Sequence, residues 1–265
     1  MSAALTEHGK PRPADRRSAG QGRPCLYAAP KRLEYRRALE LQRRIVDARY
    51  RQLLDRDVLL ILEHPSVFTL GRRGGRDNLT VSERFLSERG IAVVHVERGG
   101  DITYHGPGQI VGYPILNLRG SPLSVTDYVT ALEEVMIRTA ADFGVAAGRD
   151  ARNRGIWVKN CKLGSIGISI RHGISFHGFA FNVNLDLGPF DWINPCGLKG
   201  IGVTSLAREL GSPVSTADAR AVISAHIQQV LQLNLIASTV EELETLLGDG
   251  PGSERRENQI HGTGT

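Results

Sequence analysis

The chain has 265 residues, of which 41% are hydrophobic, and carries a formal net charge of +5. Its apolar runs, such as Val58 to Leu62, have the length of a strand and fall far short of the roughly 20 residues that span a bilayer. The first 24 residues are basic and lack the apolar centre of a secretory signal. We expect a cytoplasmic protein without a membrane partner, built as one domain over residues 25–248 between disordered tails at 1–24 and 249–265.

Residues 31–56 form a strongly basic stretch in which apolar residues recur at helical spacing. Nine Lys and Arg side chains outnumber four acidic ones in it. Such a helix is either a solvated face or a dock for an acidic protein partner. Nucleic acid is not expected as a partner, because no nucleic-acid-binding motif accompanies the charge.

The remaining chain alternates between strand and helix patterns, which predicts a mixed α/β fold with sheets flanked by helices. Ser124 with Asp127 predicts a capping box at the start of a helix that ends before Gly144, and Thr216 and Ser238 are predicted as later N-caps. The predicted elements are strands at 57–63, 91–97 and 110–116, helices at 82–89 and 124–143, a β region over 155–186 and a helical C-terminal third.

The segment 98–109 joins two of these strands and reads Arg-Gly-Gly-Asp-Ile-Thr-Tyr-His-Gly-Pro-Gly-Gln. Its four glycines allow the backbone to approach a ligand closely or to adopt positive φ angles. The alternatives are a ligand-binding segment and a tight connection in which His105 is a core residue. Neither the phosphate-loop lysine nor the GxGxxG order of a dinucleotide site is present, so nucleotide binding is not indicated.

A single lysine, Lys162, stands at the start of an otherwise apolar strand of small residues that continues to Gly167. A lysine at such a position either extends its ammonium group to water or points it into a pocket. In the second case it supplies a local positive charge to the group that reacts there.

Three cysteines, Cys25, Cys161 and Cys196, are too few and too unevenly spaced for a disulfide framework or a zinc site. Cys196 lies in a predicted turn between a proline and a glycine, which is typical of a presented side chain. At an ordinary pKa of about 8.5 little thiolate exists at pH 7, so a nucleophilic Cys196 needs a cation such as Lys162. Cys161 is expected to point to the opposite face of its strand from Lys162, and Cys25 lies beside the N-terminal tail.

Several motifs in one order resemble the octanoyltransferases, also called lipoyl(octanoyl) transferases, of lipoic-acid biosynthesis. The resemblance covers about residues 59–206. It rests on the segments 63–71 (EHPSVFTLG), 98–109, the strand from Lys162, 175–178 (SFHG) with 182–184 (NVN), and 193–197 (INPCG).

The resemblance implies a fold similar to the catalytic domain of biotin and lipoate protein ligases, which is related to class II aminoacyl-tRNA synthetases. It implies that Cys196 is the nucleophile and Lys162 the residue that lowers its pKa. A departure from the family is Gly164, where alanine is common, and a looser pocket is expected there. The implied acyl-binding residues are Arg98, Gly99, Gly100, Asp101, Ile102, Thr103, Tyr104, His105, Ser165, Ile166, Gly167, Gly178, Phe179 and Ala180.

The reaction implied by the resemblance moves an octanoyl group from acyl carrier protein through a thioester on Cys196. The acceptor is a lysine ε-amine on lipoyl domains of 2-oxo-acid dehydrogenase E2 subunits or on the glycine cleavage H protein. No metal, ATP or other cofactor is expected.

Three other functions remain as alternatives. An ATP-dependent lipoate–protein ligase on the same fold activates a free acid and needs no nucleophilic cysteine. A thiol hydrolase needs a histidine and an Asn or Asp that orient the cysteine, and it releases free acid instead of a protein amide. A noncatalytic basic binding module leaves the segment 98–109 without a role.

Overall fold

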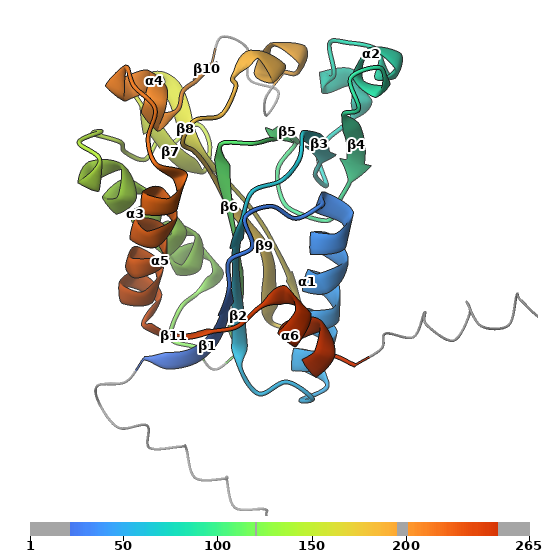
Figure 1. Ribbon diagram of the computed structural model, residues 1–265, viewed down its shortest axis with the longest axis vertical. Helices are drawn as coiled ribbons and strands as arrows, with labels where there is room; N and C mark the ends of the chain where they lie inside the picture. Colours follow the sequence, from blue (N-terminus) through green and yellow to red (C-terminus); the bar gives the residue numbers. More distant parts are fainter. Residues whose placement is uncertain (1–21, 120, 195–200, 249–265) are drawn as a thin grey trace, which may run out of the picture.

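The computed structural model describes residues 22–119, 121–194 and 201–248, and a large mixed sheet forms the centre of this part of the chain (Figure 1). Its strands follow the order β10, β8, β9, β6, β2, β1, β11, and β7 pairs with β8 outside this row. Neighbours from β7 through β8, β9 and β6 to β2 are antiparallel, whereas β1 is parallel to β2 and β11, and β10 is parallel to β8. The bounds are β1 Arg23–Ala28, β2 Asp57–Leu62, β6 Gln109–Ile115, β7 Gly155–Val158, β8 Cys161–Arg171, β9 Ile174–Asn182, β10 Gly202–Val203 and β11 Leu233–Ala237.

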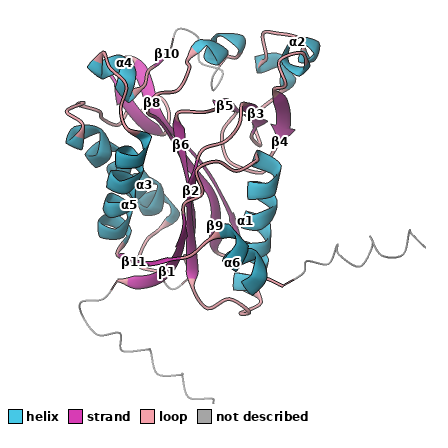
Figure 2. Cartoon of the chain, in the orientation of Figure 1, coloured by secondary structure: helices cyan, strands magenta, loops and turns pink. Residues whose placement is uncertain are grey.

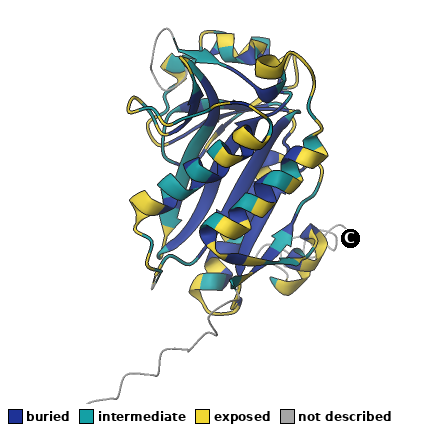
Figure 3. Ribbon diagram, turned by 90° about the vertical axis from the view of Figure 1, so that its left-hand side faces the viewer, coloured by how far each residue is buried: buried dark blue, intermediate teal, exposed yellow. Residues whose placement is uncertain are grey.

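Helices cover both faces of this sheet, which confirms the predicted α/β class (Figure 2). The central strand β2 is buried along its whole length, as expected for a strand covered on two sides. Leu59 and Ile61 pack in the core beneath α3 and α5, whereas Val58 and Leu60 pack in the core beneath α1 and α6. Figure 3 views the molecule from the side covered by α3 and α5, with the buried strands behind them. The bounds are α1 Tyr35–Tyr50, α3 Val125–Asp142, α5 Thr216–Leu231 and α6 Val240–Leu246.

A second, small sheet lies beside one end of the main sheet and carries α2 (Figure 1). In it β3 is parallel to β4 and antiparallel to β5. β3 was not predicted, and β5 lies inside the segment 98–109, for which no strand was predicted. The bounds are β3 Val67–Leu70, β4 Ala92–His95, β5 Ile102–His105, α2 Glu83–Ser87, α4 Leu206–Leu210 and the short 3-10 helices η1 Arg76–Asn78 and η2 Gly188–Trp192.

The helix starts agree with the sequence in one case and differ by one residue in two. The capping box of Ser124 and Asp127 is present at α3. The N-cap of α5 is Ser215 and not the predicted Thr216, because the Ser215 side chain accepts the hydrogen bond from the third amide of the helix. For the same reason Thr239, not Ser238, caps α6.

The basic stretch forms helix α1, and several of its arginines are paired with carboxylates of the same chain. Arg43 makes a two-bond contact with Glu97, at 2.7 and 2.9 Å. Arg37 contacts Glu244 in the same way. Both arginines are about half exposed, so the choice between a solvated face and a dock for an acidic partner stays a prediction.

Candidate active site

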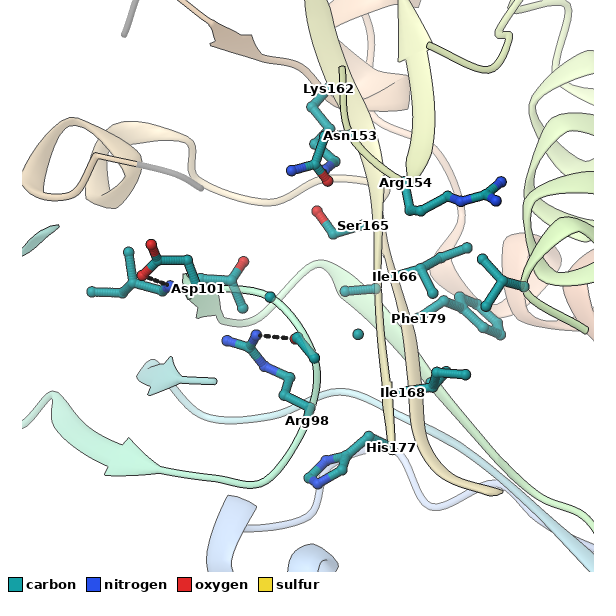
Figure 4. A pocket seen from close by; sticks show the side chains of 18 of the residues that line it. Arg98, Asp101, Asn153, Arg154, Lys162, Ser165, Ile166, Ile168, His177 and Phe179 are labelled. Carbon is teal, nitrogen blue, oxygen red and sulfur yellow. Dashed lines mark hydrogen bonds between the residues drawn. The ribbon is translucent and has the colours of Figure 1, made fainter. Parts of the chain in front are cut away.

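A cavity of about 670 Å³ lies between the paired strands β8 and β9 of the main sheet and the glycine-rich segment that contains β5 (Figure 4). It is lined by residues from all three predicted substrate-binding segments and by Lys162. The tertiary structure thus brings together segments that are far apart in the sequence, from Arg98 to Ala180.

Arg98 connects the glycine-rich segment to β3 through its guanidinium group. Its side chain is buried, and its guanidinium donates to the backbone oxygen of Thr69 at 2.7 Å, to the Thr69 hydroxyl at 2.8 Å and to the Gly99 oxygen at 3.0 Å. Gly100 adopts a φ of +85°, which favours glycine. Arg98, Gly99 and Gly100 all line the cavity, so backbone as well as side-chain atoms form this wall.

Asp101 ends the turn and fixes the start of β5. One carboxylate oxygen accepts the amide N–H of Ile102 at 2.6 Å, and the other accepts the side-chain amide of Asn78 at 2.7 Å. Asp101, Ile102 and Thr103 line the cavity.

The last two residues of the predicted segment, Tyr104 and His105, differ in whether they line the cavity. Tyr104 does not line the cavity: its hydroxyl lies 2.8 Å from that of Ser66, and its ring packs against Phe68 in the small core of the second sheet. His105 does line it, with its Nδ1 2.7 Å from the Gln109 side-chain oxygen. Burial lowers the pKa of His105 to about 3, so the ring is neutral.

The cavity is also lined by Ser165, Ile166 and Gly167 on β8 and by Gly178, Phe179 and Ala180 on β9. These residues face one another in register, as Ser165 with Ala180, Ile166 with Phe179 and Gly167 with Gly178. The side chains of Ile166 and Phe179 point away from Arg98 (Figure 4). A Cβ atom on Gly167 would lie 3.0 Å from the Arg98 side chain and 3.1 Å from the Gly99 oxygen. Glycine at position 167 therefore allows the glycine-rich segment to approach β8 closely.

Gly164 does not belong to this wall, contrary to the expectation of a looser pocket. A Cβ atom there would meet the Met136 sulfur at 2.7 Å and Ile156 at 3.0 Å. The residue faces the core beneath α3, where an added methyl group would require the Met136 side chain to shift, and it is absent from the cavity lining.

Lys162 lines one end of the cavity with a side chain that is only 8% exposed. Its Nζ donates to the Asn153 side-chain oxygen at 2.8 Å and lies 5.1 Å from the centre of the Trp157 ring. Of the two readings of this lysine, the structure supports the one in which the ammonium points into a pocket. Asn153 carries no sequence signal, because it lies on a loop nine residues before the lysine.

Cys196 lies outside the described residues. The chain that follows it is described from Ile201, and β10 pairs Gly202 with Cys161 and Val203 with Lys162. The described residues that follow this segment therefore lie beside the lysine strand, whereas Asn194, which precedes it, donates its amide N–H to the Asn78 oxygen at 2.8 Å.

The two other cysteines are placed differently. Cys25 is wholly buried in β1, and burial raises the pKa of its thiol far above the usual range. The predicted tail at 1–24 therefore includes two residues, Arg23 and Pro24, that belong to β1. Cys161 is partly exposed beside Gly202, and it is absent from the cavity lining.

The end of the cavity away from Lys162 is polar (Figure 4). Tyr35 from α1, Tyr113 from β6 and His177 from β9 line it together with Arg98 and His105. Tyr35, Tyr113 and His177 were not named as site residues. His177 belonged to a recognised motif, but Tyr35 and Tyr113 have the spacing of ordinary core residues in an amphipathic helix and a buried strand.

His177 differs from the other buried histidines. It is 1% exposed, its φ is +55°, and neither ring nitrogen has a hydrogen-bond partner within the described part of the chain. Its Nε2 lies 3.9 Å from a Glu97 oxygen, beyond hydrogen-bonding distance. By contrast His64, also buried, is bonded at both nitrogens, at 2.7 Å each, to the Leu33 oxygen and the Tyr113 hydroxyl.

Among the described residues no cluster of three or more His, Cys, Asp or Glu side chains could hold a metal ion. No helix in the same ranges is long and apolar enough to cross a membrane.

Known proteins resemble this chain in sequence and in fold. The model of the lipoyl protein ligase A/B catalytic domain matches residues 34–228. An octanoyltransferase of Desulfotalea psychrophila is 58% identical over 181 residues, which are 68% of this chain and 81% of the relative. An octanoyltransferase of Syntrophobacter fumaroxidans is 45% identical over 217 residues, 82% of this chain and 95% of the relative.

Among solved structures, lipoate-protein ligase A bound with ATP superposes with a TM-score of 0.68. It is 16% identical, and the match covers 86% of this chain and 92% of the ligase, so this likeness concerns the fold alone. The sequence relatives, which are much more similar, share one activity. The chain therefore belongs to the octanoyltransferases, acyltransferases of the lipoyl protein ligase A/B catalytic-domain family.

Proposed function

We propose that this chain transfers an octanoyl group from acyl carrier protein to a lysine ε-amine through a thioester on Cys196. The acceptors are lipoyl domains of 2-oxo-acid dehydrogenase E2 subunits and the glycine cleavage H protein, and the reaction takes place in the cytoplasm. The observation that carries the proposal is the buried Lys162 ammonium at one end of a cavity of about 670 Å³.

In the first half-reaction the Cys196 thiolate attacks the carbonyl carbon of the carrier's thioester. A new C–S bond forms to Cys196, the C–S bond to the carrier breaks, and the leaving thiolate takes up a proton. Little bond energy changes, so no ATP is required. The positive charge of Lys162 favours the thiolate form of a nearby thiol by lowering its pKa.

In the second half-reaction the acceptor amine attacks the enzyme thioester. A C–N bond forms, the C–S bond to Cys196 breaks, and the proton lost by the amine returns to the thiolate. Because an amide replaces a thioester, the step is downhill. In this proposal Lys162, whose ammonium is bonded to Asn153, passes this proton.

Backbone N–H groups that point at the developing oxyanion lower the barrier of both steps. The glycine-rich segment supplies backbone to the cavity wall at Gly99 and Gly100. Its close approach to β8 supports a role in holding the acyl group.

The test is intact-mass spectrometry after mixing the protein with octanoyl-acyl carrier protein in the absence of ATP. We expect the protein to gain the mass of one octanoyl group, located on the peptide that contains Cys196, and to lose it when an unmodified lipoyl domain is added. Transfer that requires free octanoate and ATP would instead identify a ligase. Release of free octanoate without amide formation would identify a hydrolase.

A further inference from the structure

Lys162 lies at a point of the main sheet where one neighbouring strand replaces another. Over residues 161–165 β8 pairs with β7 on one edge, and over residues 164–171 it pairs with β9 on the other. β9 ends at Asn182, and beside Lys162 its place is taken by the two-residue strand β10 (Figure 1). The Thr204 amide, directly after β10, donates to the Lys162 oxygen at 3.0 Å. At this edge the backbone of Lys162 is therefore held by β10 and the residue that follows it.

The side chain of Asn182 adds a bond to β10, which is too short to be held firmly by its own pairing. Asn182 Nδ2 donates to the Thr204 oxygen at 2.9 Å. Thr204 is 1% exposed, so water cannot replace this bond if the donor is lost. Asn182 is the last residue of the strand that β10 replaces, so its side chain joins the two strands at the place where they change over.

The same asparagine belongs to a chain of buried side chains that ends at the cavity wall. Its Oδ1 accepts from Gln109 Nε2 at 2.9 Å, and this nitrogen also donates to the Tyr104 oxygen at 3.2 Å. The Oε1 atom of Gln109 lies 2.7 Å from Nδ1 of His105, which lines the cavity. Each polar side-chain atom of Gln109 and Asn182 thus has a partner, and a fully paired network of this kind is rigid.

Two backbone oxygens set the direction of every bond in this chain. A carbonyl oxygen can only accept, so the amide nitrogens of Gln109 and Asn182 must face Tyr104 and Thr204 respectively. The oxygen of Gln109 is then turned to the His105 ring, which donates from Nδ1. The chain therefore has a single arrangement, and it fixes β10 relative to the cavity wall.

Asn182 and Lys162 lie on the same face of the main sheet. Their neighbours Phe181 on β9 and Leu163 on β8 pack in the core beneath α3. Because side chains alternate along a strand, Asn182 and Lys162 point to the opposite face. Lys162 lines the cavity, but Asn182 is absent from its lining. Asn182 therefore acts through the residues that it holds and not by touching a bound substrate.

We propose that Asn182 is a positioning residue for acyl transfer: it fixes β10 against β8 and so keeps the Lys162 ammonium where it acts on the nucleophile. The inference rests on the proposed function, because it takes Lys162 to lower the pKa of Cys196. Without Asn182 the Thr204 oxygen loses its bond, β10 is held less firmly, and the backbone at Lys162 gains freedom. A misplacement on the order of 1 Å can lower the rate of an enzyme by about 100-fold.

The first experiment compares Asn182→Ala with a matched control, Asn184→Ala. Asn184 belongs to the same recognised motif, 182–184, and is absent from the cavity lining. Its side chain bonds the Val214 oxygen at 2.6 Å and the Val214 amide at 2.9 Å. Each replacement therefore removes an amide group that makes two hydrogen bonds, but only Asn182 is bonded to Thr204.

We expect Asn182→Ala to slow acyl-enzyme formation from octanoyl-acyl carrier protein by about tenfold or more. The midpoint of Cys196 alkylation by iodoacetamide should move to higher pH. Asn184→Ala should leave the rate and the midpoint unchanged, although urea unfolding should show that both variants lose stability. An unchanged rate and midpoint in Asn182→Ala would overturn the proposal, as would equal losses in the two variants.

A double-mutant cycle measures whether Asn182 acts through the lysine. In Lys162→Met, which has no ammonium, the further replacement Asn182→Ala should cause little additional shift of the alkylation midpoint. A shift of full size in that background would overturn the proposal, because the effect would then not pass through Lys162.

Hydrogen exchange of the unaltered protein tests the proposal without any replacement, so it remains decisive if Asn182→Ala does not fold. The Thr204 amide should exchange as slowly as the amides within β9, because β10 is fixed at both sides. Exchange as fast as in exposed loops would overturn the proposal. Absence of any acyl-enzyme in the unaltered protein would overturn the proposed function as well, whereas a normal acyl-enzyme that Asn182→Ala leaves unaffected would overturn the positioning role alone.

Discussion

A buried polar side chain lies at each end of the cavity, and the two side chains differ in their hydrogen bonding. At one end Lys162 is fixed by a 2.8 Å hydrogen bond to Asn153 and faces the Trp157 ring. At the other end the His177 ring has no hydrogen-bond partner within the described residues, while its backbone is held by Gln42. Lys162 is therefore held through its side chain, whereas His177 is held through its backbone.

The comparison is tested most strongly at the lysine end, by replacing the nucleophile. Cys196→Ser should lower the rate of acyl transfer by on the order of 10³-fold or more, as loss of a nucleophile does in other enzymes. Cys161→Ser should leave most of the activity, because Cys161 is absent from the cavity lining. The measurement is acyl-enzyme formation followed by intact mass. An equal loss from Cys161→Ser, with an unchanged circular dichroism spectrum, would mean that the wrong thiol was chosen.

Cys25→Ser should also retain transfer, although Cys25 is wholly buried and the replacement should lower the thermal midpoint. We therefore expect this variant to lose stability without losing activity.

The next largest effect is expected from the lysine itself. Lys162→Met keeps much of the stem volume and removes the ammonium, so the pKa of Cys196 should rise toward or above about 8.5. Each unit of that rise lowers the thiolate fraction near pH 7 about tenfold. The measurement is the rate of Cys196 alkylation by iodoacetamide against pH. The midpoint should move to higher pH in Lys162→Met. A midpoint equal to that of the unaltered protein would contradict the proposal that Lys162 lowers the pKa of Cys196.

In the same variant, raising the pH should recover part of acyl-enzyme formation, because hydroxide supplies the thiolate that the lysine no longer favours. Amide formation should recover less, since Lys162 is also proposed to pass a proton in that step.

A smaller effect is expected from Asn153, which acts through Lys162 as a positioning residue. Asn153→Ala removes the acceptor of the 2.8 Å hydrogen bond and should slow acyl-enzyme formation by about tenfold, the equivalent of roughly 1.4 kcal/mol. Asn153→Asp keeps an oxygen at that place and should restore the rate. The Cys196 alkylation midpoint should shift in the alanine variant and return in the aspartate variant. A rate loss without that shift would indicate a structural role only.

The smallest effect is expected on the pH dependence of folding stability, to which two buried histidines contribute. Burial lowers the pKa of His64 from 6.5 to about 4 and that of His105 to about 3. The unfolded chain therefore takes up protons first, so stability is complete above pH 6.5 and is lost as the pH falls toward 4. Each histidine contributes up to about 1.4 kcal/mol per pH unit in that range. Urea unfolding between pH 7 and pH 4.5 measures the slope.

His64→Gln should reduce this slope, whereas His172→Gln, at an exposed position, should leave it unchanged. A slope that is the same in all three proteins would contradict the assignment of acid sensitivity to the buried histidines.

Much of the fold follows from local pattern. The capping box at Ser124 and the left-handed Gly144 bound α3 as predicted, because both signals act within one turn of the helix. The strand β3 was missed, since its four residues are joined to β4 and β5 by pairings that no local pattern encodes. The one-residue errors at Ser215 and Thr239 arise because two adjacent hydroxyl residues are both competent caps.

The sequence by itself determined the α/β class through its alternating strand and helix patterns, and it indicated the family and most of the cavity wall through motifs that resemble those of octanoyltransferases. Only the tertiary structure decided which side chains meet there. It separated Tyr104 from the wall through the pleat of β5, joined Asn153 to Lys162, and turned the His177 ring into the cavity through a positive φ. These placements depend on contacts between elements far apart in the chain, and a linear pattern does not contain such contacts.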